Sequence, residues 1–218
     1  MNRFNSPVRA RAAVAAAALA AFGLALFSRG WPRDDRARIL ENPLLRAGWA
    51  GAGRLLSTGL WQSVMGAQAQ VCEWRPVLSL SFLLQREITG FAPFPLHAVN
   101  VGLHIAVSLL TFEALRRRLP ARAAAAGALI FAVNPVHAEV VAYLTSRSEL
   151  LAAASVLGAW LLLDATRHPS PKQISAGAAV YLAGALSKEH ALLFPLFLAL
   201  ADWTFAVAIT YRDTAAMT

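Results

Sequence analysis

The chain has 218 residues, of which 57% are hydrophobic and 15% are charged, and its formal net charge is +8. Soluble domains are roughly 45–50% apolar and about 25% charged, so a soluble fold would have nowhere to bury this much apolar surface. The basic residues are dispersed and flank apolar runs, as membrane topology signals do, so nucleic acid is not expected as a partner. The single cysteine, Cys72, excludes an internal disulfide and a multi-cysteine metal site.

The fold class predicted from these features is an all-α, polytopic membrane protein with about six transmembrane helices, forming a single membrane domain over residues 1–218. The first apolar run, Ala12 to Phe27, follows three arginines and is not followed by a typical signal-peptidase site. An uncleaved span near residues 10–28 is therefore favoured over a secretory signal peptide. The preceding arginines place the N-terminus in the cytoplasm.

Residues 29–93 contain no segment with the ~20 apolar residues that a span requires, and they are predicted to form a long non-cytoplasmic loop. From Asn42 to Trp61, apolar residues recur at helical spacing, which suits a helix lying at the membrane interface. The run from Val77 to Leu84 is too short to cross, so it is predicted to be a second interfacial or re-entrant piece.

Five further spans are predicted near residues 94–115, 121–134, 149–165, 173–187 and 190–209. Alternation from a cytoplasmic N-terminus places the basic clusters of the later connections inside, and the C-terminus with them. The third and fifth spans are short, and either extend beyond their polar ends or stop below the surface in a cavity. Eighteen of the twenty basic residues are arginine and alanine is abundant, which favours a GC-rich bacterial genome and a bacterial inner membrane.

Polar residues that the apolar runs do not explain fall on the predicted outer face. A charged side chain at the centre of a membrane helix raises the free energy of membrane insertion by about 2.5–3.5 kcal/mol. Such a side chain is therefore expected to have a partner or a function. These residues are Asp34, Asp35, Arg75, His97, Asn100, His104, His137, Glu139, Arg147, Glu149, Lys188 and Glu189. Their convergence on one side predicts a shared outer cavity.

Asp34 and Asp35 place two carboxylates where the first span meets the outer surface. Such a pair can act as a general base or hold a divalent cation, which is the one cofactor that the residues suggest. Alternatively, the pair stabilises a helix N-terminus or forms ion pairs with Arg33 and Arg36.

His97, Asn100 and His104 are spaced i, i+3 and i+7, so they share one helical face, which is predicted to look into the bundle. These side chains either form interhelical hydrogen bonds or line the site. His97 lies nearer the outer end and is the better site candidate. For His104, hydrogen bonding explains the residue at least as well.

Asn134 and Pro135 predict a helix start that leaves His137 and Glu139 in the first turn. A His-x-Glu pair can bind a metal, but two ligands are too few to define a site.

Ser146 and Glu149 match a capping box, which makes Glu149 structural. Arg147 between them has no such explanation, and its guanidinium could hold a phosphate through two hydrogen bonds. Lys188 and Glu189 either pair with each other in a turn or serve the site.

In this order the motifs resemble the membrane part of the transmembrane and tetratricopeptide-repeat (TMTC-type) O-mannosyltransferases and their bacterial relatives. The resemblance runs from about Asp34 to Asp202. Its main motifs are Asp34-Asp35, Trp74-Arg75-Pro76-Val77, Leu96-His97-Ala98-Val99-Asn100, Asn134-Pro135-Val136-His137-Ala138-Glu139, Ser146-Arg147-Ser148-Glu149-Leu150 and Leu186-Ser187-Lys188-Glu189. Such proteins usually continue into further spans and then repeats of about 34 residues, which this sequence does not show, so a fragment or a reduced relative is expected.

The resemblance implies a multi-pass glycosyltransferase of the C superfamily. It would transfer a sugar such as mannose from a polyprenyl-phosphate donor in the membrane lipid to a hydroxyl of a protein or glycan acceptor. Asp34 and Asp35 take the catalytic positions. By charge and side of the membrane, the candidates for the donor phosphate are Arg75, Arg147 and Lys188, and further site candidates are His97, Asn100, His137, Glu139 and Glu189. The alternatives are an inactive membrane scaffold or lipid-binding protein and, less favoured, a transporter.

Overall fold

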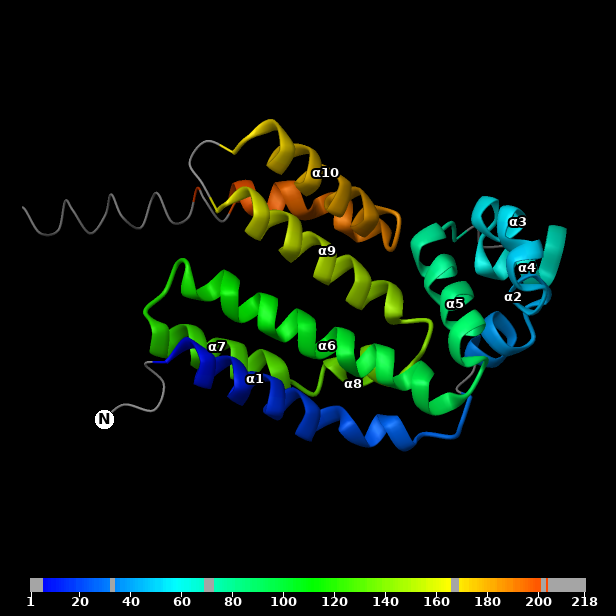
Figure 1. Cartoon of the computed structure of the whole chain (residues 1–218), viewed down its shortest axis with the longest axis horizontal. Helices are drawn as coiled ribbons and strands as arrows, with labels where there is room; N and C mark the ends of the chain where they lie inside the picture. The colour runs from blue at the N-terminus through cyan, green and yellow to red at the C-terminus, as the bar shows by residue number, and fades with distance from the viewer. Residues whose placement is uncertain (1–5, 32–33, 69–72, 166–168, 201–202, 204–218) are drawn as a thin grey trace, which may run out of the picture.

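The structure is a computed structural model, which describes residues 6–31, 34–68, 73–165, 169–200 and 203. The regular elements of these residues are all helical, which confirms the predicted fold class at that level. Figure 1 shows two parts, a bundle of long helices and a group of short helices that covers one end of it.

The bundle is built around α6 (Pro93–Arg116), which packs on three other long helices. These are α1 (Pro7–Phe22), which continues as the 3₁₀ helix η1 (Gly23–Phe27), α7 (Ala121–Val133) and α9 (Arg147–Leu163). The outermost helix, α10 (Pro171–Ala185), packs on α9.

Small residues allow α9 and α10 to approach closely. A Cβ atom added at Gly184 would lie 3.0 Å from the Cβ atom of Ser155, and one added at Gly177 would lie 2.9 Å from a carbon of Leu163. Close contact through small residues is the usual way in which apolar helices associate when no water is present to drive them together.

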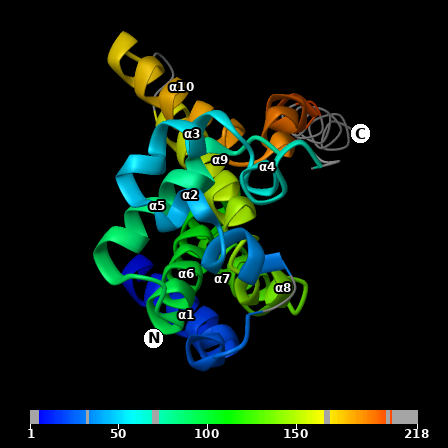
Figure 2. The same ribbon diagram turned by 90° about the vertical axis from the view of Figure 1, so that its right-hand side faces the viewer.

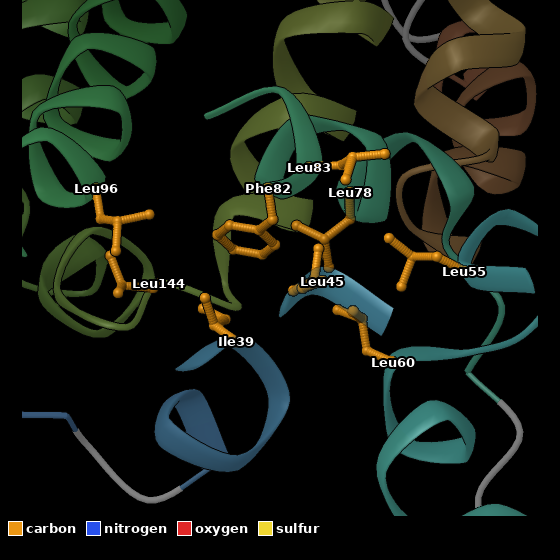
Figure 3. Close-up of a cluster of buried hydrophobic side chains, with 9 residues drawn as sticks. All are labelled: Ile39, Leu45, Leu55, Leu60, Leu78, Phe82, Leu83, Leu96 and Leu144. Carbon is orange, nitrogen blue, oxygen red and sulfur yellow. The ribbon is translucent and has the colours of Figure 1, made fainter. Parts of the chain in front are cut away.

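The short helices come mainly from residues 36–89. In chain order they are the π-helix η2 (Arg36–Leu40), α2 (Pro43–Arg46), η3 (Gly48–Gly51), α3 (Ala52–Ser57), α4 (Leu60–Met65), η4 (Gly66–Gln68) and α5 (Pro76–Thr89). Viewed from their side, they lie in front of the ends of α6 and α9 (Figure 2). Their apolar side chains form one core with Leu96 of α6 and with Leu144, just before α9 (Figure 3).

The single interfacial helix expected between residues 42 and 61 is broken into short pieces. Asn42 does cap a helix, because its side chain accepts hydrogen bonds from the backbone of Leu44 and Leu45. The helix ends early because Gly48 takes φ +64°, a conformation that a regular helix does not contain. The run from Val77 to Leu84 lies within a longer helix, α5, and its interfacial or re-entrant position stays a prediction.

Two helical segments are long and apolar enough to cross a membrane by length and composition, Pro7–Phe27 and Pro93–Arg116. Helices α7, α9 and α10 have 13, 17 and 15 residues, below the ~20 that a straight crossing requires. The last predicted span begins as η5 (Glu189–Leu193) and continues as an apolar helix to Leu200. Its predicted end at residue 209 lies outside the described residues, as do both termini, Arg33 and Cys72.

Helix α7 is short because Asn134 and Pro135 follow it, and the carbonyl group of Ala132 in its last turn has a hydrogen-bond partner inside the bundle. The ring nitrogen Nε2 of His104 lies 3.0 Å from the carbonyl oxygen of Ala132, and a carbonyl can only accept, so Nε2 carries the hydrogen. His104 therefore has a structural role, in agreement with the hydrogen-bonding alternative in the sequence analysis.

The bundle end opposite the short helices carries exposed or partly exposed ion pairs. Glu113 of α6 accepts hydrogen bonds from Arg11 of α1 and from Arg116. Asp164 accepts from Arg117 at 3.1 Å and from Arg118 at 3.0 Å. These contacts join α1 to α6 and α6 to the end of α9.

Candidate functional site

Arg147 lies at the centre of the junction between the short helices and the bundle. It is the first residue of α9 and is fully buried. Its Nε donates to Oδ1 of Asn100 at 2.9 Å, its Nη2 to the carbonyl of Leu96 at 3.1 Å, and its Nη1 lies 3.4 Å from Oγ of Ser81. The guanidinium carbon lies 4.3 Å from the ring centroid of Phe82. Arg147 thus joins α9, α6 and α5, and its hydrogen-bond partners in the described structure are all neutral.

Asn100 completes this junction from α6. Its Nδ2 donates to the carbonyl of Tyr143 at 3.0 Å and to that of Val141 at 3.4 Å, while its Oδ1 accepts from Arg147. The amide therefore holds the segment before α9 against α6 and fixes the position from which the guanidinium enters the core.

Asp34 and Asp35 have different environments. Asp35 is fully buried, and its carboxylate accepts from the backbone N–H of Leu144 at 2.7 Å and from the backbone and hydroxyl of Thr145 at 3.0 and 2.7 Å. Asp34 is exposed. Arg36, an alternative partner for the pair, binds Glu41 instead. Asp35 therefore ties the start of η2 to the turn that carries Arg147, whereas Asp34 faces solvent.

His97 lies one turn before Asn100 on the same face of α6. It is 1% exposed, and neither ring nitrogen has a hydrogen-bond partner among the described residues. His97, Asn100 and His104 are all buried, which confirms the predicted inward face. An unpaired buried polar group is costly, so His97 marks a place where a further polar partner would be stabilising.

Arg75, the second predicted phosphate ligand, is occupied by carboxylates. Its Nε and Nη2 each donate to Glu189 at 3.1 Å, and its Nη1 donates to Glu73 at 3.1 Å. Glu73 also pairs with Arg38. Burial alone raises the pKa of Glu189, but the hydrogen bonds and charge of Arg75 outweigh it and hold the pKa below its ordinary value.

Lys188 is the third predicted phosphate ligand, and its Nζ lies 2.8 Å from Oε1 of Glu149. The other carboxylate oxygen of Glu149 lies 3.3 Å from Nε2 of His190. The predicted capping box is wrong, because the side chain of Ser146 makes no capping hydrogen bond and Glu149 turns to Lys188. The predicted turn in which Lys188 and Glu189 pair with each other is also replaced by separate pairs to α9 and to Arg75.

His137 and Glu139 lie in α8 (His137–Ala142), beside α7. The His137 ring is 4.4 Å from that of Phe131 and 5.1 Å from that of His104, and burial lowers the pKa of His137 below its ordinary value. Glu139 is exposed. Across the described ranges, no group of three or more His, Cys, Asp or Glu side chains is arranged to hold a metal ion. The binding of a divalent cation therefore stays a suggestion from the sequence.

Comparison with known proteins gives a consistent set of relatives. The chain is 35% identical over 178 residues to protein O-mannosyl-transferase Tmtc1 of Drosophila melanogaster, covering 79% of this chain and 20% of the relative. It is 34% identical over 158 residues to TMTC1 of Mus musculus, covering 71% of this chain and 17% of the relative. It is 32% identical over 143 residues to TMTC4 of Homo sapiens, covering 59% of this chain and 19% of the relative. The chain belongs to the TMTC-type family. It spans about a fifth of the length of these relatives. No family model and no solved structure matches it.

Several residues that build the site were not singled out from the sequence. Ser81, Phe82 and Gln85 lie on one side of α5, in a segment whose apolar run had been noted for its length rather than for its polar residues. Glu73 precedes a motif of this family, and the alternation of charge from Glu73 to Arg75 was the available signal for an ion pair. Nothing in the local sequence indicates that Phe82 lies under Arg147, because this contact joins two distant segments.

Proposed function

We propose that the chain forms the membrane-embedded site of a glycosyltransferase that moves a sugar from a polyprenyl-phosphate donor to an acceptor hydroxyl on the non-cytoplasmic face. Mannose is the proposed sugar, and a protein or glycan the proposed acceptor, because the relatives are named protein O-mannosyl-transferases. The matched segment covers about a fifth of the length of these relatives, so their activity is a proposal for this chain.

The observation that supports the proposal most strongly is the burial of Arg147 among uncharged hydrogen-bond partners in the described structure. Of the three cations proposed for the donor phosphate, Arg75 and Lys188 are bound to carboxylates, whereas Arg147 is buried and its hydrogen-bond partners among the described residues are neutral. Among the described residues no carboxylate is hydrogen-bonded to this guanidinium, although the charge of the buried Asp35 acts on it. A buried guanidinium without a directly bound carboxylate favours an anion, and its planar fork matches phosphate oxygens. Arg147 is therefore the proposed primary phosphate ligand. Arg75 and Lys188 remain secondary candidates, since each must first leave a glutamate.

Asp34 is the proposed general base. Its exposed carboxylate can take the proton from the acceptor hydroxyl while the hydroxyl oxygen attacks the anomeric carbon. The bond from that carbon to the phosphate oxygen breaks, and the guanidinium of Arg147 stabilises the charge left on the departing lipid phosphate. Asp35 accepts three hydrogen bonds from residues 144 and 145, so in this proposal it positions the segment between the base and Arg147.

The remaining site candidates take supporting roles in the proposal. Asn100 orients Arg147, and the unpaired nitrogens of His97 are available to a sugar or phosphate oxygen. Glu189 sets the availability of Arg75. His137 and Glu139 border α7 and are assigned no step.

Six membrane crossings are part of the proposal, with the N-terminus and C-terminus in the cytoplasm of a bacterial cell. Its support is the arrangement in Figure 1, where the N-terminal end of α1, the α6–α7 connection, the end of α9 and the start of α10 lie together, away from the short helices. Arg116, Arg117 and Arg118 fall at that end, as the positive-inside rule requires of a cytoplasmic face.

An inactive membrane scaffold is the second candidate function. It is favoured by the ion pairs that neutralise Arg75 and Lys188, because these pairs join α5, α9 and η5 without any ligand. A scaffold would tolerate the loss of the exposed Asp34 carboxylate, and this separates the two functions.

The test is transfer of radiolabelled mannose from polyprenyl-phosphate mannose to a serine- and threonine-containing peptide, in membranes that contain the chain. Asp34→Asn should lower transfer by roughly 10²- to 10⁴-fold, the usual contribution of a general base, without changing the unfolding temperature. Glu41→Gln is the matched control, because it neutralises another exposed acid of the same segment, and it should leave transfer unchanged. If the folded and inserted parent chain transfers no mannose, or if Asp34→Asn transfers it normally, the catalytic assignment is withdrawn.

A further inference from the structure

A cleft of about 480 Å³ lies between the end of η1 and the start of α6. Its apolar walls include the rings of Phe27 and Phe94, which are 72% and 53% exposed and whose centroids lie 6.3 Å apart. The described residues that line it are Leu26, Phe27, Ser28, Arg29, Pro93 and Phe94. The cleft therefore presents apolar surface to a ligand at the bundle end that carries the short helices.

Arg29 is the only charged residue among the described residues that line this cleft. It is exposed, and no carboxylate in the described part of the chain pairs with it. The arginines of the neighbouring short segments differ, because Arg36, Arg38 and Arg75 all have glutamate partners. A guanidinium beside apolar walls suits a ligand that carries a carboxylate next to an apolar side chain.

The packing below the cleft favours a peptide over a lipid chain. Both α1 and η1 pack on α6, and the ring of Phe22 lies 4.9 Å from that of His104. These contacts fill the space between the two helices toward the centre of the bundle. An acyl chain follows the length of neighbouring helices, whereas a side chain needs only a short cleft at their ends. The occupant that fits is therefore a short segment of peptide.

The cleft lies near the proposed base and the proposed phosphate ligand. Arg29 and Asp34 are five positions apart, and a chain spans at most about 3.6 Å per residue, so their Cα atoms lie within about 18 Å of each other. An extended peptide covers the same distance in about five residues. Phe94 also lines the cleft between α5 and α6 to which Arg147 contributes. One ring thus borders both the cleft of Arg29 and the surroundings of Arg147.

We propose that the cleft of Arg29 selects acceptor peptides that carry an acidic side chain within about five residues of the serine or threonine that receives the sugar. The inference rests on the proposed function and names the class of its acceptor. The carboxylate of the peptide binds Arg29, and a neighbouring apolar side chain packs between Phe27 and Phe94. A carboxylate directly next to the hydroxyl would lie beside Asp34 and be repelled by it, so the adjacent positions are not favoured.

The first experiment compares acceptor peptides in the mannose-transfer assay. Each peptide contains one threonine, with a glutamate, or glutamine as its neutral counterpart, at a series of distances from it. Glutamate about three to five positions away should raise kcat/KM about three- to fivefold over glutamine, as one exposed ion pair allows. Glutamate next to the threonine should give no increase. A salt concentration of 1 M should remove the preference, because the Debye length falls to about 3 Å.

Charge reversal at Arg29 tests the partner of the carboxylate. Arg29→Glu should reverse the preference, so that a peptide with lysine in place of the glutamate becomes the better acceptor. Arg54→Glu is the matched control, because it reverses an exposed arginine of α3 outside the cleft, and it should keep the preference for glutamate. Neither side chain has an ion-pair partner among the described residues, so both variants should unfold at the temperature of the parent.

Photo-crosslinking measures binding separately from transfer. The photo-reactive residue p-benzoylphenylalanine replaces Phe27 in the full chain, which is reconstituted into phosphatidylcholine vesicles with a radiolabelled glutamate peptide. Illumination should label the chain, and the unlabelled glutamate peptide should compete better than the glutamine peptide. Phosphatidylglycerol added to the vesicles should not compete. The same photo-reactive residue in place of Trp49, an exposed aromatic residue outside the cleft, is the matched control and should give only background labelling.

The outcomes distinguish this inference from the proposed function. Equal transfer to the glutamate and glutamine peptides, or an Arg29→Glu variant that keeps the preference for glutamate, overturns the inference and leaves the proposed function in place. Competition by phosphatidylglycerol overturns the inference as well, because the cleft would then hold a lipid head group. Glutamate-selective labelling at position 27 without any transfer supports the cleft as a site for acidic peptides and removes the proposed function.

Discussion

The two ends of the helix bundle use charged residues in opposite ways. At the end away from the short helices, Glu113 and Asp164 sit between arginines in exposed or partly exposed pairs. At the other end, Arg147 and Asp35 are both fully buried, and each is bound to neutral partners. The first arrangement is typical of a polar helix end facing water. The second removes two charges from water without pairing them directly.

This difference shows where function is to be sought. An exposed ion pair typically contributes less than about 1 kcal/mol to the stability of the fold. The pairs at the first end therefore need no explanation beyond membrane topology and solubility. Burying a charge is costly, and such groups persist where something depends on them. The short helices make the difference, because they cover one end of the bundle and exclude solvent from it.

The largest expected effect follows from Arg147→Met. This change leaves Oδ1 of Asn100 and the carbonyl of Leu96 without their donor inside the core, and each unsatisfied acceptor costs about 1–3 kcal/mol. We expect a loss of about 3 kcal/mol in the free energy of unfolding, measured by denaturant titration in detergent micelles. Arg117→Met at the opposite end is the control and should cost less than about 1 kcal/mol. Equal losses in the two variants would remove the distinction between the ends.

A smaller effect is expected from Asp35→Asn. An amide keeps one acceptor but presents N–H groups toward the backbone N–H of Leu144 or Thr145, so at least one buried hydrogen bond is lost. We expect a cost of about 2 kcal/mol in the same titration. Asp164→Asn is the matched change at the opposite end, with an expected cost below about 1 kcal/mol because its arginine partners are partly exposed. An Asp35→Asn variant as stable as the parent would show that the buried carboxylate does not hold this turn.

The smallest effect concerns Glu189 and depends on pH. Its folded pKa lies below the ordinary value of 4.5, so its pair with Arg75 contributes stability that is fully present above pH 4.5 and is lost as the pH falls through the folded pKa. Glu189→Gln should lower stability by less than about 1 kcal/mol at neutral pH, and the difference from the parent should shrink below pH 4.5. Unfolding temperatures measured from pH 7 to pH 3 test this. A difference that persists unchanged at low pH would show that the pair is not the cause.

Relations within one helix were predictable from the sequence. The spacing of His97, Asn100 and His104 places them on one face because the helical repeat is fixed, and all three are buried. Asn134 and Pro135 end α7 where their backbone preferences require. The long apolar runs marked the bundle helices to within a few residues, since apolar length and periodicity are local properties.

Relations between segments were not predictable in the same way. Asp34 and Asp35 look equivalent in the sequence, but one is exposed and the other binds residues 144 and 145, which are more than a hundred positions away. Likewise, Glu149 pairs with Lys188 rather than completing a capping box, because η5 brings a cation to it. Hydrogen-bond partners are chosen by distance in space, and spacing along the chain does not encode that distance.

The sequence by itself determined that this protein is helical and apolar, that His97, Asn100 and His104 share one helical face, and which family motifs it carries. Only the tertiary structure decided which of the polar residues are buried, which are neutralised, and which remain available to a ligand. The physical reason is that the free energy of a charge depends on its solvation and its partners. In this protein both are set by the short helices packing over Arg147, a contact between segments distant in the chain.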